Sequence, residues 1–421
     1  MLRKTKILSV FTGIAFSGAI CTAQADLTAE QELGQALYFD QNLSVNHNQS
    51  CASCHDPGFG FVDPDNVMYG TPVSDGSFTD RFGGRNSPSA AYAMFSPFFH
   101  WDSAEGLYVG GQFWDGRANT LADQAAGPFL NPVEMAMPDK WSVVDRLRTS
   151  MGADYVTMFQ NVYQLDLNAI PPYNWSGAPI SDGTMPPGVL EIYDRMARAI
   201  GEFEKSSMFA PFTSKFDYYL AGMVKLSKEE EKGLKIFNGK GKCNLCHTSE
   251  PTVAPDGSQT PPLFTDFTYD NLGVPANLNI PGAPLPLDLG LGGRPDIAAK
   301  DPAGNEIGKF KVMTLRNIAV TAPYAHNGVF RTLEEIVHFY NTRDALPSCD
   351  PTTGNNDLGF GTTCWPAPEV AQNVNTEELG NLRLNPKQEA ELVAFLKTLT
   401  DGWGEQNGMP PLPDKGKNKN K

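Results

Sequence analysis

Two copies of the pattern C-x-x-C-H, about 190 residues apart, constrain this chain more than any other feature of its sequence. They are CASCH at residues 51–55 and CNLCH at residues 243–247. The pattern is the attachment signal for c-type haem, in which two thiols bind the haem vinyl groups and the adjacent histidine ligates the iron. Zinc is the alternative, but a zinc site needs a second cysteine or histidine pair nearby, and neither motif has one. The sequence therefore predicts two covalently bound haem c groups, held by Cys51, Cys54 and His55 and by Cys243, Cys246 and His247.

The same short unit precedes each haem motif. Thr28 and Ser227 each begin a capping box, T-A-E-Q and S-K-E-E, which opens a short amphipathic helix. Asn385 as N-cap, followed by Pro386, opens a third strong helix of the kind that a haem domain packs on its cofactor. The fold class expected is mainly α, with two cytochrome c-like haem domains, long loops and haems near the domain interface. Other helices are expected at 141–151, 188–203 and 332–340, and Gly/Pro-rich loops at 56–90 and 250–308.

The N-terminus has the features of a secretory signal. Basic residues are followed by an apolar run at 7–20 and by A-Q-A before Asp26, so cleavage is expected after Ala25. The apolar run is too short to span a membrane, and no later segment is long enough. We therefore expect a periplasmic or otherwise exported protein without a membrane span. The predicted divisions are a signal peptide at 1–25, an N-terminal haem domain at 26–223, a C-terminal haem domain at 224–404 and a disordered tail at 405–421.

The formal net charge of the chain is -15, and it becomes -18 once Arg3, Lys4 and Lys6 leave with the signal. Binding to nucleic acid needs a basic face, so nucleic acid is excluded as a partner. A basic redox protein would suit this charge, although such steering acts on the association rate more than on affinity.

Cys349 and Cys364 are the remaining cysteines of the mature chain. They lie in a Gly/Pro/Asn-rich stretch without helical periodicity, in a chain expected in an oxidising compartment. A structural disulfide that closes this loop is the prediction, and it would stabilise the fold by about 3 kcal/mol.

Longer strings outside the haem motifs resemble the di-haem bacterial cytochrome c peroxidase and MauG superfamily over nearly the whole mature chain. This resemblance implies that the first haem is the peroxidatic one and that the second transfers electrons. The matching strings are QFWDGRA at 112–118, GP at 127–128 and NPVEM at 131–135, then TLRN at 314–317, TAPYAHNG at 321–328 and TLEE at 332–335.

The resemblance implies roles for three residues between the haem motifs. Trp114 would lie between the haems and help electrons or holes to pass, while Gln124 and Glu134 would line the distal pocket of the first haem. Peroxide cleavage needs a group that takes a proton from one oxygen and returns it to the leaving oxygen, and Glu134 could do both. Gln124 would hold peroxide or water by hydrogen bonding. The alternatives are a solvated helix-start charge for Glu134 and a plain core aromatic for Trp114.

The family also holds a calcium ion between its domains. The positions that match its ligands are the side chain of Asn86 and the carbonyl groups of Thr321 and Pro323. Oxygen ligands completed by water suit the loose coordination sphere of calcium. Without the resemblance, an Asn before Ser-Pro would be interpreted as a turn residue.

Two departures separate this chain from the ordinary peroxidases. Those enzymes commonly carry a second histidine after the first haem motif, but residues 56–85 contain none, and the closest positional match is Thr71. The first haem is therefore predicted to be five-coordinate or water-bound, and open to peroxide. Ordinary members also supply a methionine fourteen residues after the position of His326, where this chain has Tyr340. A tyrosine there resembles the MauG-type pattern, in which phenolate favours high oxidation states.

The other histidines are weaker candidates as iron ligands. His338 is two residues from Tyr340, about 200° around a helix, so the two cannot face the same iron. His326 is expected to hydrogen-bond near the second haem rather than to ligate it, and Met313 is the alternative axial ligand if Tyr340 is misaligned. His47 and His100 are interpreted as structural.

Three functions are compatible with these residues. The first is a MauG-like enzyme that uses hydrogen peroxide to form a high-valent two-haem oxidant and oxidises Trp or Tyr residues of a partner protein. The second is a periplasmic cytochrome c peroxidase that reduces peroxide with electrons from a small cytochrome or cupredoxin. The third is a non-catalytic di-haem carrier, which an open iron beside Gln124 and Glu134 disfavours. Tyr340 and the missing histidine favour the first function, although the MauG enzyme has a tryptophan before its second haem motif where this chain has GKGK at 239–242.

Overall fold

The computed structural model describes residues 26–150, 152–253 and 259–412. The predicted signal peptide at 1–25, with its cleavage after Ala25, and the end of the predicted tail at 413–421 lie outside the described residues. The fold is mainly helical, as the sequence predicts. Its α-helices are α1 Ala29–Phe39, α2 Cys51–Cys54, α3 Pro64–Tyr69, α4 Leu121–Ala126, α5 Lys140–Arg148, α6 Tyr155–Tyr163, α7 Val189–Phe203, α8 Lys215–Leu220, α9 Lys228–Phe237, α10 Pro295–Ala298, α11 Leu333–Thr342, α12 Pro386–Lys397 and α13 Trp403–Gln406.

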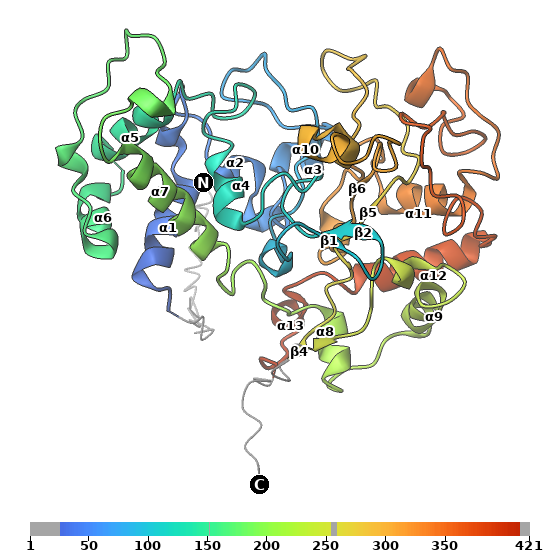
Figure 1. Cartoon of the computed structure of the whole chain (residues 1–421). Helices are drawn as coiled ribbons and strands as arrows, with labels where there is room; N and C mark the ends of the chain where they lie inside the picture. Colours follow the sequence, from blue (N-terminus) through green and yellow to red (C-terminus); the bar gives the residue numbers. More distant parts are fainter. Residues whose placement is uncertain (1–25, 151, 254–258, 413–421) are drawn as a thin grey trace, which may run out of the picture.

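Two separate hydrophobic cores divide these helices between two sides of the molecule (Figure 1). In the first core, α1 packs against α7, which also receives α4 and α5. In the second core, α9 packs against α12, which also contacts α11. Phe216 of α8 belongs to the second core. The division at residues 223 and 224 stays a prediction.

A glycine at the close crossing of two helices is repeated in both cores. Gly34 of α1 lies so near α7 that a Cβ atom there would overlap the Ala199 carbonyl oxygen and crowd Phe203. Gly233 of α9 lies in the same way against the Glu391 carbonyl oxygen and Phe395 of α12. Each glycine comes six residues after the N-cap of its helix, at Thr28 and Ser227. The repeat seen in the sequence before each haem motif therefore extends to the helix that packs on it.

Short antiparallel ladders join the loops between the two cores. The strands are β1 His100–Asp102, β2 Leu107–Val109, β3 Thr252–Val253, β4 Gln259–Thr260, β5 Tyr269–Asp270 and β6 Phe310–Lys311, paired β1 with β2, β3 with β4 and β5 with β6. The β1–β2 hairpin projects between the two helical regions in Figure 1. Within the described residues, no helix is both long and apolar enough to cross a membrane.

The local predictions agree well with the structure. Capping boxes at Thr28 and Ser227 begin α1 and α9, and Asn385 caps α12 with Pro386 in its first turn. The predicted Cys349–Cys364 disulfide is confirmed, with Cα atoms 4.9 Å apart. Helices α4, α6 and α8 were not predicted, since they have only six to nine residues and too few turns for a strong periodic pattern. The predicted loops at 56–90 and 250–308 and the predicted tail at 405–421 are also wrong in part, because α3 and α10 lie within the loops and α13 extends into the tail. Both loop helices begin with a proline in their first turn, which is a helix-start signal.

The glycine crossings give a direct test of this packing. Gly34→Ala or Gly233→Ala should lower the free energy of unfolding by about 1–3 kcal/mol or more, because the added methyl group must push two packed helices apart. Gly183→Ala is the matched control, since a Cβ atom there meets nothing within 4 Å. Chemical denaturation of the haem-loaded proteins, followed by circular dichroism, measures the difference. Equal stabilities for the crossing variants and the control would contradict the close-packing role.

Candidate functional site

The first haem motif lines a cavity of about 720 Å³ beside the first core. Cys51 and Cys54 lie at the two ends of the single-turn helix α2, and His55 follows it directly. Both thiols are free, and burial raises the pKa of Cys51 to about 12, with the Glu204 carboxylate adding to the shift. All three residues line the cavity. Two free thiols and an imidazole on one wall of a large cavity fit a covalently attached haem c.

His55 is held in one orientation by its surroundings. Its Nδ1 lies 3.1 Å from the carbonyl oxygen of Phe61, and the Tyr38 hydroxyl donates to the His55 carbonyl oxygen over 2.8 Å. Metal-bound histidines commonly donate their second ring nitrogen to a carbonyl group in this way, which leaves Nε2 for the metal. Burial lowers the pKa of His55, so the neutral, ligating form is favoured.

Gln124 and Glu134 also line the first cavity. Gln124 belongs to α4, and Glu134 follows the turn after that helix. The Asn131 amide donates to Oε1 of Glu134 over 2.9 Å and fixes the carboxyl group. Burial raises the pKa of Glu134, against the opposing effects of the Arg117 charge and the Asn131 hydrogen bond. A raised pKa brings a carboxyl group nearer to the range in which it can both take and return a proton.

The second haem motif lines a smaller cavity of about 180 Å³ in the other half of the molecule. Cys243, Cys246 and His247 face it together, and both thiols are free. His247 repeats the arrangement of the first site, since its Nδ1 lies 2.8 Å from the carbonyl oxygen of Phe264. Burial lowers the pKa of His247 to about 4. This motif fits a second haem c by the same criteria.

Tyr340 of α11 lies in the wall of this second cavity. No described residue makes a hydrogen bond with its hydroxyl group, and burial raises its pKa, with the two haem-motif thiols as further causes. Met313, the alternative ligand, lines the same cavity. His338 has another partner, because its Nδ1 lies 2.9 Å from Oε1 of Glu389.

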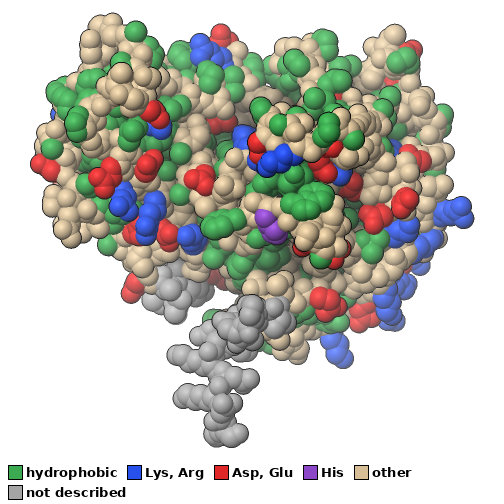
Figure 2. Space-filling view, in the orientation of Figure 1, with side chains coloured by type: hydrophobic (Ala, Val, Ile, Leu, Met, Phe, Trp, Pro, Cys, Tyr) green, Lys and Arg blue, Asp and Glu red, His purple; other side chains and the backbone are tan. Residues whose placement is uncertain are grey.

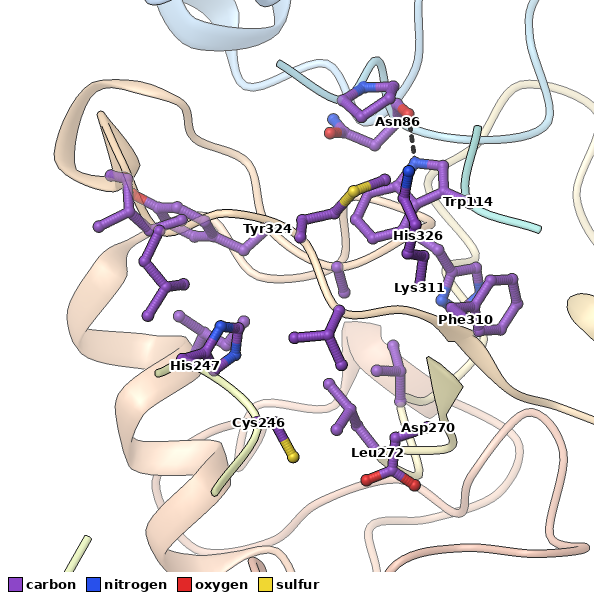
Figure 3. A pocket seen from close by; sticks show the side chains of 18 of the residues that line it. Asn86, Trp114, Cys246, His247, Asp270, Leu272, Phe310, Lys311, Tyr324 and His326 are labelled. Atoms are coloured by element: carbon purple, nitrogen blue, oxygen red, sulfur yellow. Dashed lines mark hydrogen bonds between the residues drawn. The ribbon is translucent and has the colours of Figure 1, made fainter. Parts of the chain in front are cut away.

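Trp114 lines both cavities and so lies between the two haem motifs. Its indole Nε1 donates to the Asn86 carbonyl oxygen over 2.9 Å (Figure 3). His326 lies beside it, also in both cavity walls, and stacks on Phe310 with ring centroids 3.6 Å apart. Nε2 of His326 is 3.4 Å from Oε2 of Glu369.

The three residues matched to calcium ligands share the wall of the second cavity. The Asn86 amide nitrogen donates to the Pro72 carbonyl oxygen over 3.2 Å, which leaves its oxygen atom for another partner. Among the described residues, no hydrogen bond ends on the carbonyl oxygen of Thr321 or Pro323. Three unpartnered neutral oxygens fit a cation that takes oxygen ligands and water.

The histidines interpreted as structural have ordinary partners. His47 contacts the Arg146 guanidinium at the surface. Nδ1 of exposed His100 lies 2.8 Å from the Phe98 carbonyl oxygen. Neither residue lines a haem-motif cavity.

Sequence reasoning missed several buried charges around the cavities. Glu204 lies at the end of α7 in the first cavity, burial raises its pKa to about 8, and its Oε2 has no partner among the described residues. An acidic residue at a helix C-terminus opposes the helix dipole, and this is the signal that could have found it. Lys311 is buried beside the loop of residues 110–120 that carries Trp114, called the Trp114 loop below. Its Nζ donates to the Gly111 carbonyl oxygen over 2.7 Å, and burial lowers the pKa of Lys311 to about 7. No local pattern marks that lysine as buried.

Comparisons with known proteins agree with this geometry. Residues 28–225 match a family model described as di-haem cytochrome c peroxidase. The chain is 38% identical to the methylamine utilization protein MauG of Paracoccus denitrificans, over 95% of this chain and 96% of that protein. It is 30% identical to cytochrome c551 peroxidase of Nitrosomonas europaea, over 94% of this chain and 86% of that protein.

A solved structure shows the same architecture. The diheme peroxidase BthA of Burkholderia thailandensis superposes with a TM-score of 0.69 at 30% identity, over 89% of this chain and 86% of that one. Two haem motifs, two cavities and these relatives agree in one conclusion. The chain belongs to the di-haem cytochrome c peroxidase and MauG family, and it is a di-haem oxidoreductase that uses peroxide.

Proposed function

We propose that this protein is a MauG-like enzyme, which uses hydrogen peroxide to oxidise tryptophan or tyrosine side chains of a partner protein. The observation that carries the proposal is the position of Tyr340, without a hydrogen-bond partner among the described residues, in the cavity of the second haem motif. The two haems, when bound through the C-x-x-C-H residues, supply the capacity to take electrons from the partner and deliver them to peroxide. The 38% identity to a protein named MauG supports this choice.

Glu134 carries the proton in this proposal. Its carboxyl group takes a proton from one oxygen of hydrogen peroxide and returns it to the other oxygen, which departs as water. Asn131 keeps the carboxyl group in place through the 2.9 Å hydrogen bond to Oε1. Gln124, in the same cavity, offers an amide that can hold peroxide before it reacts.

The first cavity is open to peroxide because no histidine is placed to block it. Among the described residues, the histidines in its wall are His55 and His326, and the Nε2 of His326 faces Glu369. Thr71, at the position of the usual capping histidine, is instead hydrogen-bonded to the side-chain amide of Asn66. We infer that Tyr340 ligates the second iron and that Asn86, Thr321 and Pro323 bind a calcium ion between the two cavities.

A conventional cytochrome c peroxidase is the second candidate. The 30% identity to a cytochrome c551 peroxidase favours it, and a small basic cytochrome or cupredoxin would suit the acidic chain. Both candidates place the protein outside the cytoplasm, after removal of the signal peptide.

The first test of the proposal concerns the resting enzyme. The fully oxidised protein should show one high-spin and one low-spin haem by electron paramagnetic resonance, because no capping histidine closes the first site. It should also react with peroxide without prior reduction, as followed by rapid-mixing absorbance. Two low-spin signals, with a reaction only after half-reduction, would instead support the conventional peroxidase.

Glu134→Gln tests the proton carrier. The variant should keep both haems but react with peroxide roughly 10²- to 10⁴-fold more slowly, since an amide cannot take and return the proton. Glu204→Gln neutralises another buried carboxyl group of the same cavity and is the matched control. Rapid mixing with peroxide measures both rates. A Glu134→Gln rate equal to that of the native protein would exclude the assigned role.

Tyr340→His separates the two candidate functions. Replacing an anionic oxygen ligand by a neutral nitrogen makes the second iron easier to reduce. A protein-oxidising enzyme should then lose partner oxidation while peroxide still binds at the first site, whereas a donor-driven peroxidase should keep or gain turnover with a small cytochrome. Steady-state assays with cytochrome c and residue-resolved mass spectrometry of an added protein substrate measure the two outcomes. Partner oxidation at the native rate would contradict the proposed function.

A further inference from the structure

A row of four aromatic rings connects the Trp114 loop to the protein surface through the β1–β2 hairpin. Trp101 contacts Tyr108 across the hairpin, with ring centroids 4.9 Å apart. Tyr108 stacks on Phe99 at 5.1 Å with ring planes only 6° apart, and Phe99 meets Tyr269 of β5 edge-on at 5.9 Å. Each separation lies in the range of direct aromatic contact.

Burial increases steadily along this row. The Trp101 side chain is 49% exposed, Tyr108 and Phe99 are half-buried, and Tyr269 is 5% exposed within a small core of its own. Figure 2 shows hydrophobic side chains and a histidine on the face where Figure 1 places the hairpin. The row therefore has one end in solvent and one end inside the protein.

The buried end lies against the loop that carries Trp114. The Tyr269 hydroxyl donates to the Gly110 carbonyl oxygen over 2.5 Å, and a side chain at Gly116 would collide with that hydroxyl. Lys311, which pairs with Tyr269 in the β5–β6 ladder, donates its backbone N–H to the Trp114 carbonyl oxygen over 2.8 Å. Two hydrogen-bonded routes thus join Tyr269 to the segment between the two haem cavities.

Arg294 fixes the contact between the row and that loop. Its guanidinium lies over the Phe99 ring, 4.2 Å from the centroid, and donates to the carbonyl oxygens of Asp115 and Gly116 at 3.2 and 2.7 Å. One side chain therefore contacts both the third ring of the row and the backbone beside Trp114. These contacts of Arg294 hold the Phe99 ring in a fixed position relative to the Trp114 loop.

We propose that Trp101 is the surface residue through which electrons enter from the partner protein, and that Tyr108, Phe99 and Tyr269 conduct them to the Trp114 loop. The inference rests on the proposed oxidation of a partner protein and names the contact point for it. Tryptophan and tyrosine are the side chains most easily oxidised, so Trp101, Tyr108 and Tyr269 are the residues that give up electrons in turn. Phe99 is not oxidised itself but bridges the two tyrosines, since electron tunnelling falls steeply with distance and favours groups in contact.

The electron count is balanced by two single-electron steps. One peroxide molecule takes two electrons and two protons and leaves as two waters, and the partner side chain supplies both electrons through Trp101. Without a partner, Trp101 itself becomes the donor. It loses two electrons and two protons while one water molecule adds, so the oxidised ring gains one oxygen atom from solvent.

The test treats the haem-loaded protein with a small excess of peroxide, under argon, in water labelled with ¹⁸O. Peptide mapping by mass spectrometry then compares Trp101 with Trp175, which is similarly exposed at 46% but contacts no ring of the row. We expect Trp101 to be oxidised in clear excess over Trp175 and to carry solvent oxygen. Equal oxidation of the two, or oxygen derived from peroxide, would overturn the inference.

Phe99→Leu breaks the row in its middle and should abolish the excess oxidation of Trp101. Phe98→Leu is the matched control, because the exposed ring of Phe98, directly before Phe99 in the sequence, is not part of the row. This variant should keep the excess oxidation of Trp101. An excess that survives Phe99→Leu would also overturn the inference. Peroxide consumption that oxidises no aromatic side chain would contradict the proposed function itself, whereas oxidation confined to other aromatic residues would contradict only the role of Trp101.

Discussion

The close crossing of two helices at a glycine is the constraint on which each haem unit depends. At Gly34 and at Gly233 the helix that precedes the haem motif contacts the backbone of its partner helix directly, with a phenylalanine packed four residues further along that partner. The crossing fixes α1 against α7 and α9 against α12, and the C-x-x-C-H residues follow each first helix after a short loop. Because no side chain stands between the two helix backbones at the crossing, direct backbone contact sets the distance between the helices. The two thiols and the histidine therefore start from a rigid base in both halves.

The two halves are joined by charged and aromatic residues from distant parts of the chain. Arg85 binds Asp288 through two hydrogen bonds of 2.6 and 2.8 Å and Asp115 through a third of 2.7 Å. Such bidentate pairs give geometric specificity as well as energy. They surround the region where Trp114 and His326 lie in the walls of both cavities. A single side chain, Arg85, thus joins Asp115 and Asp288 from the two halves at the wall between the haem sites.

The parts of this structure that sequence predicts are those contained in a few neighbouring residues. Capping boxes, the haem motifs and the short cysteine loop each carry their own signal, and the structure confirms the helices and the disulfide. Glu204 and Lys311 were missed because their burial depends on segments far away in the chain. Trp114, Gln124 and Glu134 were predicted as site residues from the resemblance to the family. The structure places all three in the wall of the first cavity. The assignment of Tyr340 as an iron ligand remains a prediction.

In both candidate functions, electrons pass from another protein into this one, so both functions need the same kind of entry point at the protein surface. A donor cytochrome and an oxidised partner side chain both give up electrons, so either needs an easily oxidised residue close to the haem region. The β1–β2 hairpin and Trp114 belong to the same segment, and Gly110 and Gly111 join them where a larger residue would collide with neighbouring backbone. The exposed end of the aromatic row is therefore tied to the wall between the cavities by the covalent chain as well as by hydrogen bonds. The two functions would differ in the ligand of the second iron, since an anionic oxygen there would favour high oxidation states over reduction by an outside donor.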